Sequence, residues 1–185
     1  MSERDGGGNG RAVVRRARAE DVGRVVELVA EHAEYEKSAP PAPGLATRLA
    51  GLLFGGEGAP RDASPRLRCL VAELPDGSLA GYATCAPELS TWDGVAYLHM
   101  DCLYLTSTAR GHGLGPLLMD AVRAEARALG LTEIQWQTPA WNEGAIRFYD
   151  RLGATSKEKR RYTLPVHPAA PAPASASASV LGDGE

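Results

Sequence analysis

The sequence predicts a mixed α/β sandwich built around one central sheet. Short apolar runs of strand length alternate along the chain with segments whose apolar residues recur at helical spacing. The turn Pro75-Asp76-Gly77 separates two of these runs and is typical of an antiparallel hairpin. A chain of 185 residues that is 44% hydrophobic is large enough for one domain with a substantial core. We expect this domain to span residues 11–166.

The two ends of the chain differ from this domain in composition. Residues 1–10 are glycine-rich and polar, so they bury too little apolar surface to offset the entropy cost of ordering. From His167 onward the chain repeats alanine, proline and serine, which is typical of a flexible tail. We therefore expect disordered segments over residues 1–10 and 167–185.

The expected domain begins with a strand that is followed by two helices. Residues 11–17 form the strand, and Glu20-Asp21 marks the next helix start because carboxylates favour the N-terminal end of the helix dipole. Four valines at helical spacing give that helix one apolar face: Val22, Val25, Val26 and Val29. After the break at Pro40-Pro41, a second helix is expected over residues 45–54.

A hairpin, a third apolar strand and a long helix occupy the middle of the domain. The hairpin strands are residues 67–74 and 79–84, and the next strand covers residues 97–105. A helix over residues 116–129 then ends at Gly130. The residues expected to face inward on this helix are Leu117, Leu118, Ala121, Val122 and Ala126. The last expected elements are a strand over 133–138, a helix over 143–152 and a strand over 157–164.

Charge and cysteine content exclude several classes of function. The formal net charge is −3, which gives no basic footprint for nucleic acid or for a membrane surface. The 3 cysteines have no CxxC spacing, so neither a disulfide framework nor a metal site is indicated. No stretch approaches the ~18 apolar residues that a membrane span needs. We expect a cytoplasmic protein without a metal cofactor, a nucleic-acid partner or a membrane partner.

A glycine-rich turn lies between the strand that ends at Leu105 and the helix that follows. The turn, Arg110-Gly111-His112-Gly113-Leu114-Gly115, lets the backbone approach a ligand closely. Amides at the helix start favour an anion, and Arg110 adds a charge with bidentate geometry for phosphate. These features predict a phosphate or pyrophosphate site, with a simple tight connection as the alternative. The glycine spacing does not fit a Rossmann fingerprint, and the Gly-Lys-Ser/Thr of a Walker loop is absent.

The same turn resembles the R/Q-x-x-G-x-G/A pattern of the GNAT N-acetyltransferases. Two further segments resemble this family in the right order: Leu103-Tyr104-Leu105 before the turn, and Trp141 to Tyr149 followed by Arg151 to Ala154 after it. The resemblance implies acetyl-CoA as co-substrate and a largely antiparallel sheet with a strand that splays at the cofactor site. The residues that it assigns to cofactor binding are Leu103, Tyr104, Leu105, Arg110, Gly111, His112, Gly113, Leu114, Gly115, Asn142 and Tyr149.

A narrower resemblance, over residues 15–154, is to the spermidine/spermine and thialysine N-acetyltransferase branch. It rests on three segments: Arg16 to Asp21, His32 to Glu36, and Ser90 to Gly94. The branch implies that Glu36, Trp92 and Asp101 bind the amine, because carboxylates attract an ammonium and an aromatic face adds cation–π attraction. Its members are typically dimers, so a homodimer is expected.

The resemblance also implies roles in catalysis for two side chains. Tyr149 would protonate the leaving thiolate, since a phenol with an ordinary pKa of about 10 stays protonated at neutral pH. Asp101 lies where the branch has a glutamate, and it would either accept the amine proton through water or only attract the substrate. An amide near Leu103 would polarise the thioester carbonyl. Tyr149 as a core aromatic and Asp101 as a surface carboxylate are the structural alternatives.

Together these features favour an enzyme that acetylates a primary amine of a small molecule by direct attack in a ternary complex. A polyamine or a lysine-like amino acid is the favoured acceptor. Acetylation of protein N-termini or lysines is a second hypothesis, because function depends on the acceptor groove and not on the fold. A non-catalytic sensor of coenzyme A is a third, and the presence of Tyr149 and Asp101 beside an intact cradle argues against it.

Overall fold

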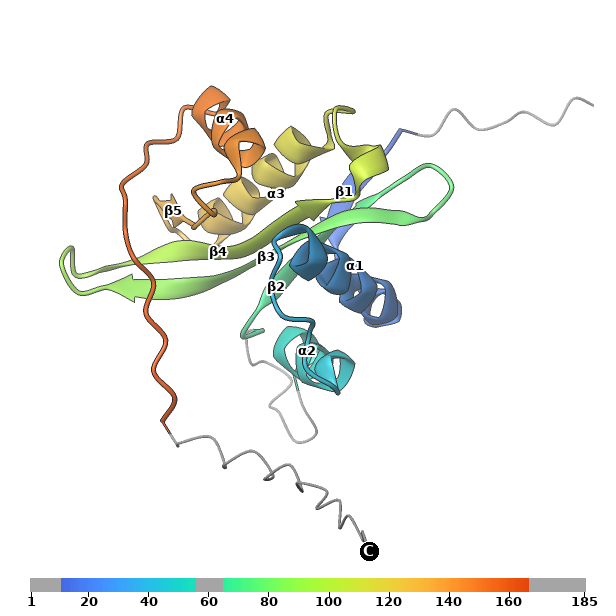
Figure 1. Ribbon diagram of the computed structural model, residues 1–185, viewed down its shortest axis with the longest axis horizontal. Coiled ribbons are helices and arrows are strands. Elements are labelled where there is room, and N and C mark those ends of the chain that lie inside the picture. The colour runs from blue at the N-terminus through green and yellow to red at the C-terminus, as the bar shows by residue number, and fades with distance from the viewer. Residues whose placement is uncertain (1–10, 56–64, 167–185) are drawn as a thin grey trace, which may run out of the picture. The chain divides into compact units, whose positions relative to one another are not determined.

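The computed structural model describes residues 11–55 and 65–166 (Figure 1). The chain divides into two compact units, Met1–Asn142 and Glu143–Glu185, and each is described by itself. The segments 1–10 and 167–185, for which the sequence predicts disorder, lie outside the described residues, so those expectations stay predictions.

The first unit is organised around a sheet of five strands in the order β1-β2-β3-β4-β5. The strands are β1 (Val13–Arg16), β2 (Arg68–Glu73), β3 (Leu79–Ser90), β4 (Val95–Leu105) and β5 (Ile134–Gln135). The first four pair antiparallel to one another, and β5 pairs parallel to β4. The sheet is therefore mixed and largely antiparallel, as the sequence predicts.

Helices cover both faces of this sheet (Figure 1). They are α1 (Val22–Tyr35), α2 (Leu45–Phe54) and α3 (Leu114–Ala128), with short 3-10 helices η1 (Ala19–Asp21) and η2 (Ser107–Ala109). Helices α1 and α2 lie on one face, and α3 lies on the other. The expected helix over residues 45–54 is confirmed at both ends.

An apolar cluster joins α1 and α2 to the sheet. Its buried members are Val25, Leu28, Leu49, Leu53, Cys69, Val71, Leu79, Tyr82 and Tyr104. The helical spacing of Val22 and Val25 predicts the buried face of α1 correctly, because both are buried there. On α3 the prediction is wrong at Leu117, which is exposed, whereas Met119 and Glu125 are buried. The helix is rotated so that Leu117 lies at the edge of the buried stripe.

Two strands differ in length from the expectation. Strand β3 continues to Ser90 instead of ending at Thr84. Proline is tolerated at position 87 because β2 pairs with β3 only as far as Cys85, so β3 is an edge strand beyond it. Strand β5 is shorter than the expected 133–138, because it pairs with β4 only at Ile134 and Gln135.

The second unit contains the helix α4 (Glu143–Arg151). Gly153 follows with φ 78°, and the amides of Gly153 and Ala154 donate to carbonyls in the last turn of α4. The expected strand over residues 157–164 is wrong, since residues 154–166 form neither helix nor strand. The expected strand begins with five charged residues, 157–161, and Tyr162 and Leu164 are exposed, so no apolar face is available to pack.

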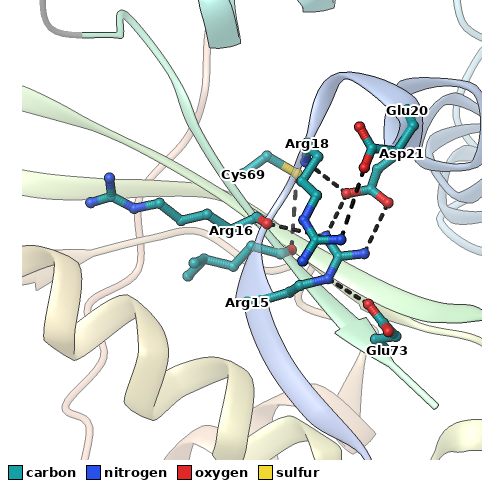
Figure 2. Close-up of polar contacts among 8 residues, drawn as sticks. Arg15, Arg16, Arg18, Glu20, Asp21, Cys69 and Glu73 are labelled. Atoms are coloured by element: carbon teal, nitrogen blue, oxygen red, sulfur yellow. Dashed lines mark hydrogen bonds and ion pairs between the residues drawn. The ribbon is translucent and has the colours of Figure 1, made fainter. Parts of the chain in front are cut away.

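A partly buried ion pair joins β1 to the start of α1 and to β2 (Figure 2). The guanidinium of Arg15 donates to both carboxylate oxygens of Asp21, at 2.6 and 3.0 Å. Asp21 also accepts from the amide of Arg18 at 2.7 Å, and Arg15 reaches Glu73 on β2. Its bidentate geometry makes this pair stronger than ordinary surface ion pairs. Arg15 holds the pKa of Asp21 below its ordinary value.

We expect Asp21→Asn to lower the free energy of unfolding by about 2 kcal/mol at pH 7, because it leaves charged donors unpaired. A carboxylate with a lowered folded pKa stabilises above its unfolded pKa of about 3.9, and this stability is lost as the pH falls through the folded value. The difference between wild type and variant, measured by urea unfolding, should therefore shrink toward pH 2. Glu20→Gln, at an exposed carboxylate 3.9 Å from Arg18, is the control and should change stability by less than about 0.5 kcal/mol. A constant difference at all pH values would contradict this role of Asp21.

Candidate active site

Strand β4 changes register against β3 at Asp101. Thr84 pairs with Cys102 whereas Cys85 pairs with Met100, so Asp101 is an extra residue on β4. Side chains alternate between the two faces of a strand, and a bulge of this kind reverses the alternation. Cys102 consequently packs against the apolar cluster under α1, and the buried Met100 points to the opposite face of the sheet.

The bulge also determines which amides of β4 face the open edge of the sheet. Strand β5 pairs with β4 only at Leu98-His99, so the rest of β4 extends beyond this neighbour. The amide of Thr106 donates to the carbonyl of Ala80 on β3 at 2.9 Å. Because amides alternate along an antiparallel strand, those of Leu103 and Leu105 face away from β3. An extended ligand can pair with a strand edge of this kind.

The glycine-rich turn connects this end of β4 to α3. Gly111 and Gly113 have φ values of 82° and 78°, in the left-handed region that favours glycine. A Cβ on either residue would meet no atom within 4 Å, so the space beside the turn is open to a ligand. Gly113 is the N-cap of α3, whose first-turn amides have no partner within the helix. The turn thus presents backbone donors and the positive end of a helix dipole.

The side chain of Arg110 binds aromatic rings next to the turn. Its Nε donates to the carbonyl of Leu105 at 3.0 Å. Its guanidinium carbon lies 4.2 Å from the ring centroid of Tyr35 and 5.5 Å from that of Tyr104. Guanidinium groups stack favourably on aromatic faces. Arg110 therefore keeps its positive charge at the turn while it connects the turn to the end of α1.

The C-terminal end of α1 brings further expected site residues together. The ring of His32 stacks on Tyr104 with centroids 5.0 Å apart, and its Nε2 lies 3.4 Å from Oε1 of Glu36. The hydroxyl of Tyr35 donates to Oδ1 of the buried Asn142 at 3.2 Å. Glu36, Tyr104 and Asn142, which the sequence assigns to binding, thus surround the same helix end.

Asp101 and Trp92 lie at more exposed positions. Asp101 is exposed at the bulge, where its Oδ2 accepts a weak hydrogen bond from the Cys102 thiol at 3.6 Å. Trp92 lies in the turn between β3 and β4 and is 99% exposed, so within one chain it packs against none of the other candidate residues. Tyr149 belongs to the second unit, where it is half-buried on α4 with its ring 5.1 Å from that of Phe148.

Three aromatic or polar residues near this site are missing from the sequence prediction. His32 and Tyr35 follow Leu28 at i+4 and i+7, so extending the apolar face of α1 by two turns would have indicated them. Tyr82 lies within the predicted strand 79–84, but nothing in the sequence indicates that its hydroxyl would contact His32.

Burial dominates the titration of the polar groups on this face of the sheet. It lowers the pKa of His32 below the ordinary histidine value, and the nearby Glu36 opposes this change. Burial also raises the pKa of Tyr82 and raises that of the Cys102 thiol to about 11. At neutral pH the imidazole, the phenol and the thiol are therefore all uncharged.

Among residues 11–55 and 65–166, no group of three or more His, Cys, Asp or Glu side chains is arranged to hold a metal ion. None of the helices in those two ranges combines the length and the apolar character that crossing a membrane requires.

Comparison with known proteins gives a family match over the part of the chain that contains β4 and the glycine-rich turn. The sequence profile described as "Acetyltransferase (GNAT) family" matches residues 57–154. This range contains the bulge at Asp101, the glycine-rich turn and α4.

Individual relatives and solved structures agree with this match. The chain is 29% identical over 149 residues to a thialysine N-epsilon-acetyltransferase from Sus scrofa, which covers 77% of this chain and 83% of the relative. It is 29% identical over 89 residues to L-ornithine N5-acetyltransferase from Arabidopsis thaliana, covering 48% of this chain and 39% of the relative. A ribosomal-protein-alanine N-acetyltransferase from Brucella melitensis biovar Abortus 2308 superposes with a TM-score of 0.65 at 17% identity, covering 84% of this chain and 99% of the other. The last likeness shows the fold alone.

We expect Gly113→Ala to lower the free energy of unfolding by about 1 kcal/mol, because an L-residue is strained at this positive φ. Gly23→Ala is the matched control, since Gly23 lies in α1 with open space where a Cβ would be added, and alanine should stabilise a helix there by about 0.5–1 kcal/mol. Urea unfolding followed by circular dichroism measures both changes. Equal stability of the Gly113 variant and the wild type would mean that the turn does not need the left-handed conformation.

Proposed function

Because the chain belongs to the acetyltransferase (GNAT) family and is an N-acetyltransferase, we propose that it transfers an acetyl group from acetyl-CoA to a primary amine of a small molecule. One observation carries the proposal: the register change at Asp101, the edge amides of Leu103 and Leu105, and the glycine-rich turn form one continuous stretch. At one end of this stretch the carboxylate of Asp101 would bind the amine, and at the other end the glycine-rich turn would bind the pyrophosphate of the cofactor.

The residues of this stretch fit coenzyme A. Open space beside Gly111 and Gly113 would accept a pyrophosphate against the first-turn amides of α3. The edge amides of Leu103 and Leu105 would pair with the pantetheine arm, and the Asn142 amide would help to hold it. When bound, acetyl-CoA supplies an activated acetyl thioester.

Asp101 would accept the proton that the substrate ammonium must lose. An alkylammonium with a pKa of about 10.4 is almost wholly protonated at neutral pH, so attack requires a proton acceptor. Asp101 is exposed at the bulge, and a backbone amide near Leu103 would polarise the thioester carbonyl. The amine would then attack the acetyl carbon directly while both substrates are bound.

Tyr149 would protonate the departing sulfur. This role follows from the resemblance of the segment around Tyr149 to the cofactor-binding half of the family. A phenol with an ordinary pKa of about 10 carries its proton at neutral pH and can donate it to a thiolate as charge develops.

The acceptor amine would be a small molecule with a positively charged chain. Glu36 would attract the ammonium, and the exposed Trp92 would add cation–π attraction. The two relatives named above act on thialysine and L-ornithine, so we favour the side-chain amine of a lysine-like amino acid over a polyamine. Trp92 and Leu89 are exposed on the same hairpin and would be covered in a homodimer, and a cytoplasmic location fits such a substrate.

Incubation with acetyl-CoA and a panel of amines, with free thiol measured, tests the proposed function. We expect turnover with thialysine, lysine or ornithine to exceed that with spermidine and with peptide N-termini. Initial rates at several concentrations of both substrates should give intersecting lines, because direct transfer has no acetylated enzyme. Turnover of peptides alone would favour protein acetylation, and tight acetyl-CoA binding without any turnover would favour a sensor.

Tyr149→Phe should lower kcat by about a hundredfold, because it removes the proton of the leaving group, while the affinity for acetyl-CoA measured by calorimetry stays within about twofold. Tyr162→Phe is the matched control, since the Tyr162 side chain is 85% exposed and has no assigned role. An unchanged kcat in the Tyr149 variant would remove this residue from the mechanism.

A further inference from the structure

Helix α1 ends in a turn whose geometry ordinarily favours glycine. The amide of Lys37 donates to the carbonyl of Glu34 at 3.0 Å, and the amide of Ser38 donates to the carbonyl of Ala33 at 2.9 Å. These two hydrogen bonds form a Schellman motif, in which the residue after the C-cap is left-handed. That residue is Lys37, with φ 55°, and among residues 11–55 and 65–166 it is the one residue other than glycine with a positive φ.

A lysine at this position costs stability that a glycine would not cost, because its Cβ crowds the following carbonyl oxygen. A positive charge at the C-terminal end of a helix is favourable, but a lysine in the last turn would supply it without the left-handed conformation. Residues held in such conformations cluster at functional sites. The side chain of Lys37 is therefore the feature that needs a functional explanation.

The ammonium of Lys37 lies beside the aromatic side chains of the candidate site. Its Nζ is 5.7 Å from the ring centroid of Trp141, and this ring lies 6.0 Å from that of Tyr35. Tyr35 in turn contacts the guanidinium of Arg110 and the amide oxygen of Asn142. Lys37 therefore borders the residues assigned to the cofactor, and all five belong to the first unit of the chain.

The positive charge of Lys37 is not neutralised within the described structure. Among residues 11–55 and 65–166, no carboxylate lies within 4.0 Å of its ammonium. The contact with Trp141 keeps the ammonium near the ring but satisfies none of its three N–H donors. Because Lys37 is exposed, an anionic group of a ligand can reach these donors.

Glu36 and Lys37 place opposite charges side by side at the end of α1. Glu36 is half-buried, with its Oε1 3.4 Å from Nε2 of His32, and Lys37 is exposed next to it. The acceptor favoured above, a lysine-like amino acid, carries a carboxylate in addition to its ammonium groups. A polyamine carries ammonium groups alone, so it would bring a second positive charge toward Lys37. The two neighbouring charges therefore match an amino acid and not a polyamine.

We propose that Lys37 binds the α-carboxylate of the acceptor and thereby selects lysine-like amino acids over polyamines. The proposal rests on the proposed function and adds a specificity-determining residue to the acceptor side of that site. Hydrogen bonds from an ammonium to a carboxylate are about twice as strong as those between neutral groups. With its carboxylate held at the end of α1, the acceptor keeps its side-chain amine free to meet Asp101.

L-Lysine and cadaverine provide the test, because the two amines differ only by the carboxylate. The measurement is kcat/KM for each amine at neutral pH with saturating acetyl-CoA. Lys37→Gln keeps most of the side-chain length and removes the charge. We expect kcat/KM to fall about tenfold for lysine and to rise about twofold for cadaverine, because the diamine no longer meets a like charge. Lys37→Glu should reverse the preference, so that cadaverine becomes the better substrate.

Arg127→Gln is the matched control for the loss of a positive charge. Arg127 is also an exposed cation at the C-terminal end of a helix, but its helix, α3, lies on the opposite face of the sheet (Figure 1). The control should preserve the preference for lysine. Equal losses for both amines in Lys37→Gln, or no change for either, would overturn the role of Lys37 and leave the proposed function intact. A wild-type protein that acetylates no amine would overturn the proposed function as well.

Thermal unfolding separates selection from a role in stability. Lys37→Gly relieves the left-handed strain, so its melting temperature should rise by about 2 °C. The same variant should lose the preference for lysine over cadaverine as Lys37→Gln does. A lower melting temperature together with an unchanged preference would mean that Lys37 serves the helix end and not the acceptor.

Discussion

The bulge in β4, where Asp101 is an extra residue relative to β3, is the constraint on which the site depends. Without it, Met100 and Cys102 would point to the same face of the sheet, because side chains alternate along a strand. With it, Cys102 turns toward the apolar cluster under α1, Met100 points to the opposite face, and the amides of Leu103 and Leu105 face the open edge. A one-residue change in register thus divides β4 into two parts. The part before Asp101 pairs with β5 at Leu98 and His99, and the part after it has edge amides that are available to a ligand.

The rest of the fold holds β4 in place while leaving that edge open. Two buried carboxylates bind β1 to helices on opposite faces: Asp21, at the start of α1, pairs with Arg15, and Glu125 on α3 accepts from Arg16 at 2.6 Å. Removing either arginine would be costly because both carboxylates are buried. Strand β3 then supports β4 along its whole length, whereas β5 pairs with only two of its residues. One edge of β4 is thus paired along its length, and the other edge is where a ligand can pair.

Sequence patterns predict most of this architecture because local periodicity and turn chemistry determine it. The valine spacing of α1 and the Pro75-Asp76-Gly77 turn each specify an element that the structure contains. The bulge has no such local signal, since it is a feature of the register between β3 and β4, which are paired by contacts across the sheet. The contact between His32 and Tyr82 depends on that register and on the packing of α1, and so it lies beyond sequence reasoning. The strand expected over 157–164 fails for the opposite reason: its local pattern carries charges where a packed strand needs an apolar face.

Aromatic side chains at the end of α1 join the two proposed halves of the site. Tyr35 contacts Arg110 of the turn through its ring and Asn142 through its hydroxyl, and Tyr104 stacks on His32 while it borders Arg110. Residues that share partners in this way do not contribute independently to binding. Movement of Arg110 toward an anion at the turn would therefore alter the surroundings of Tyr35 and His32. Direct transfer needs both substrates to be bound together, and a helix end that contacts both halves provides the physical connection between them.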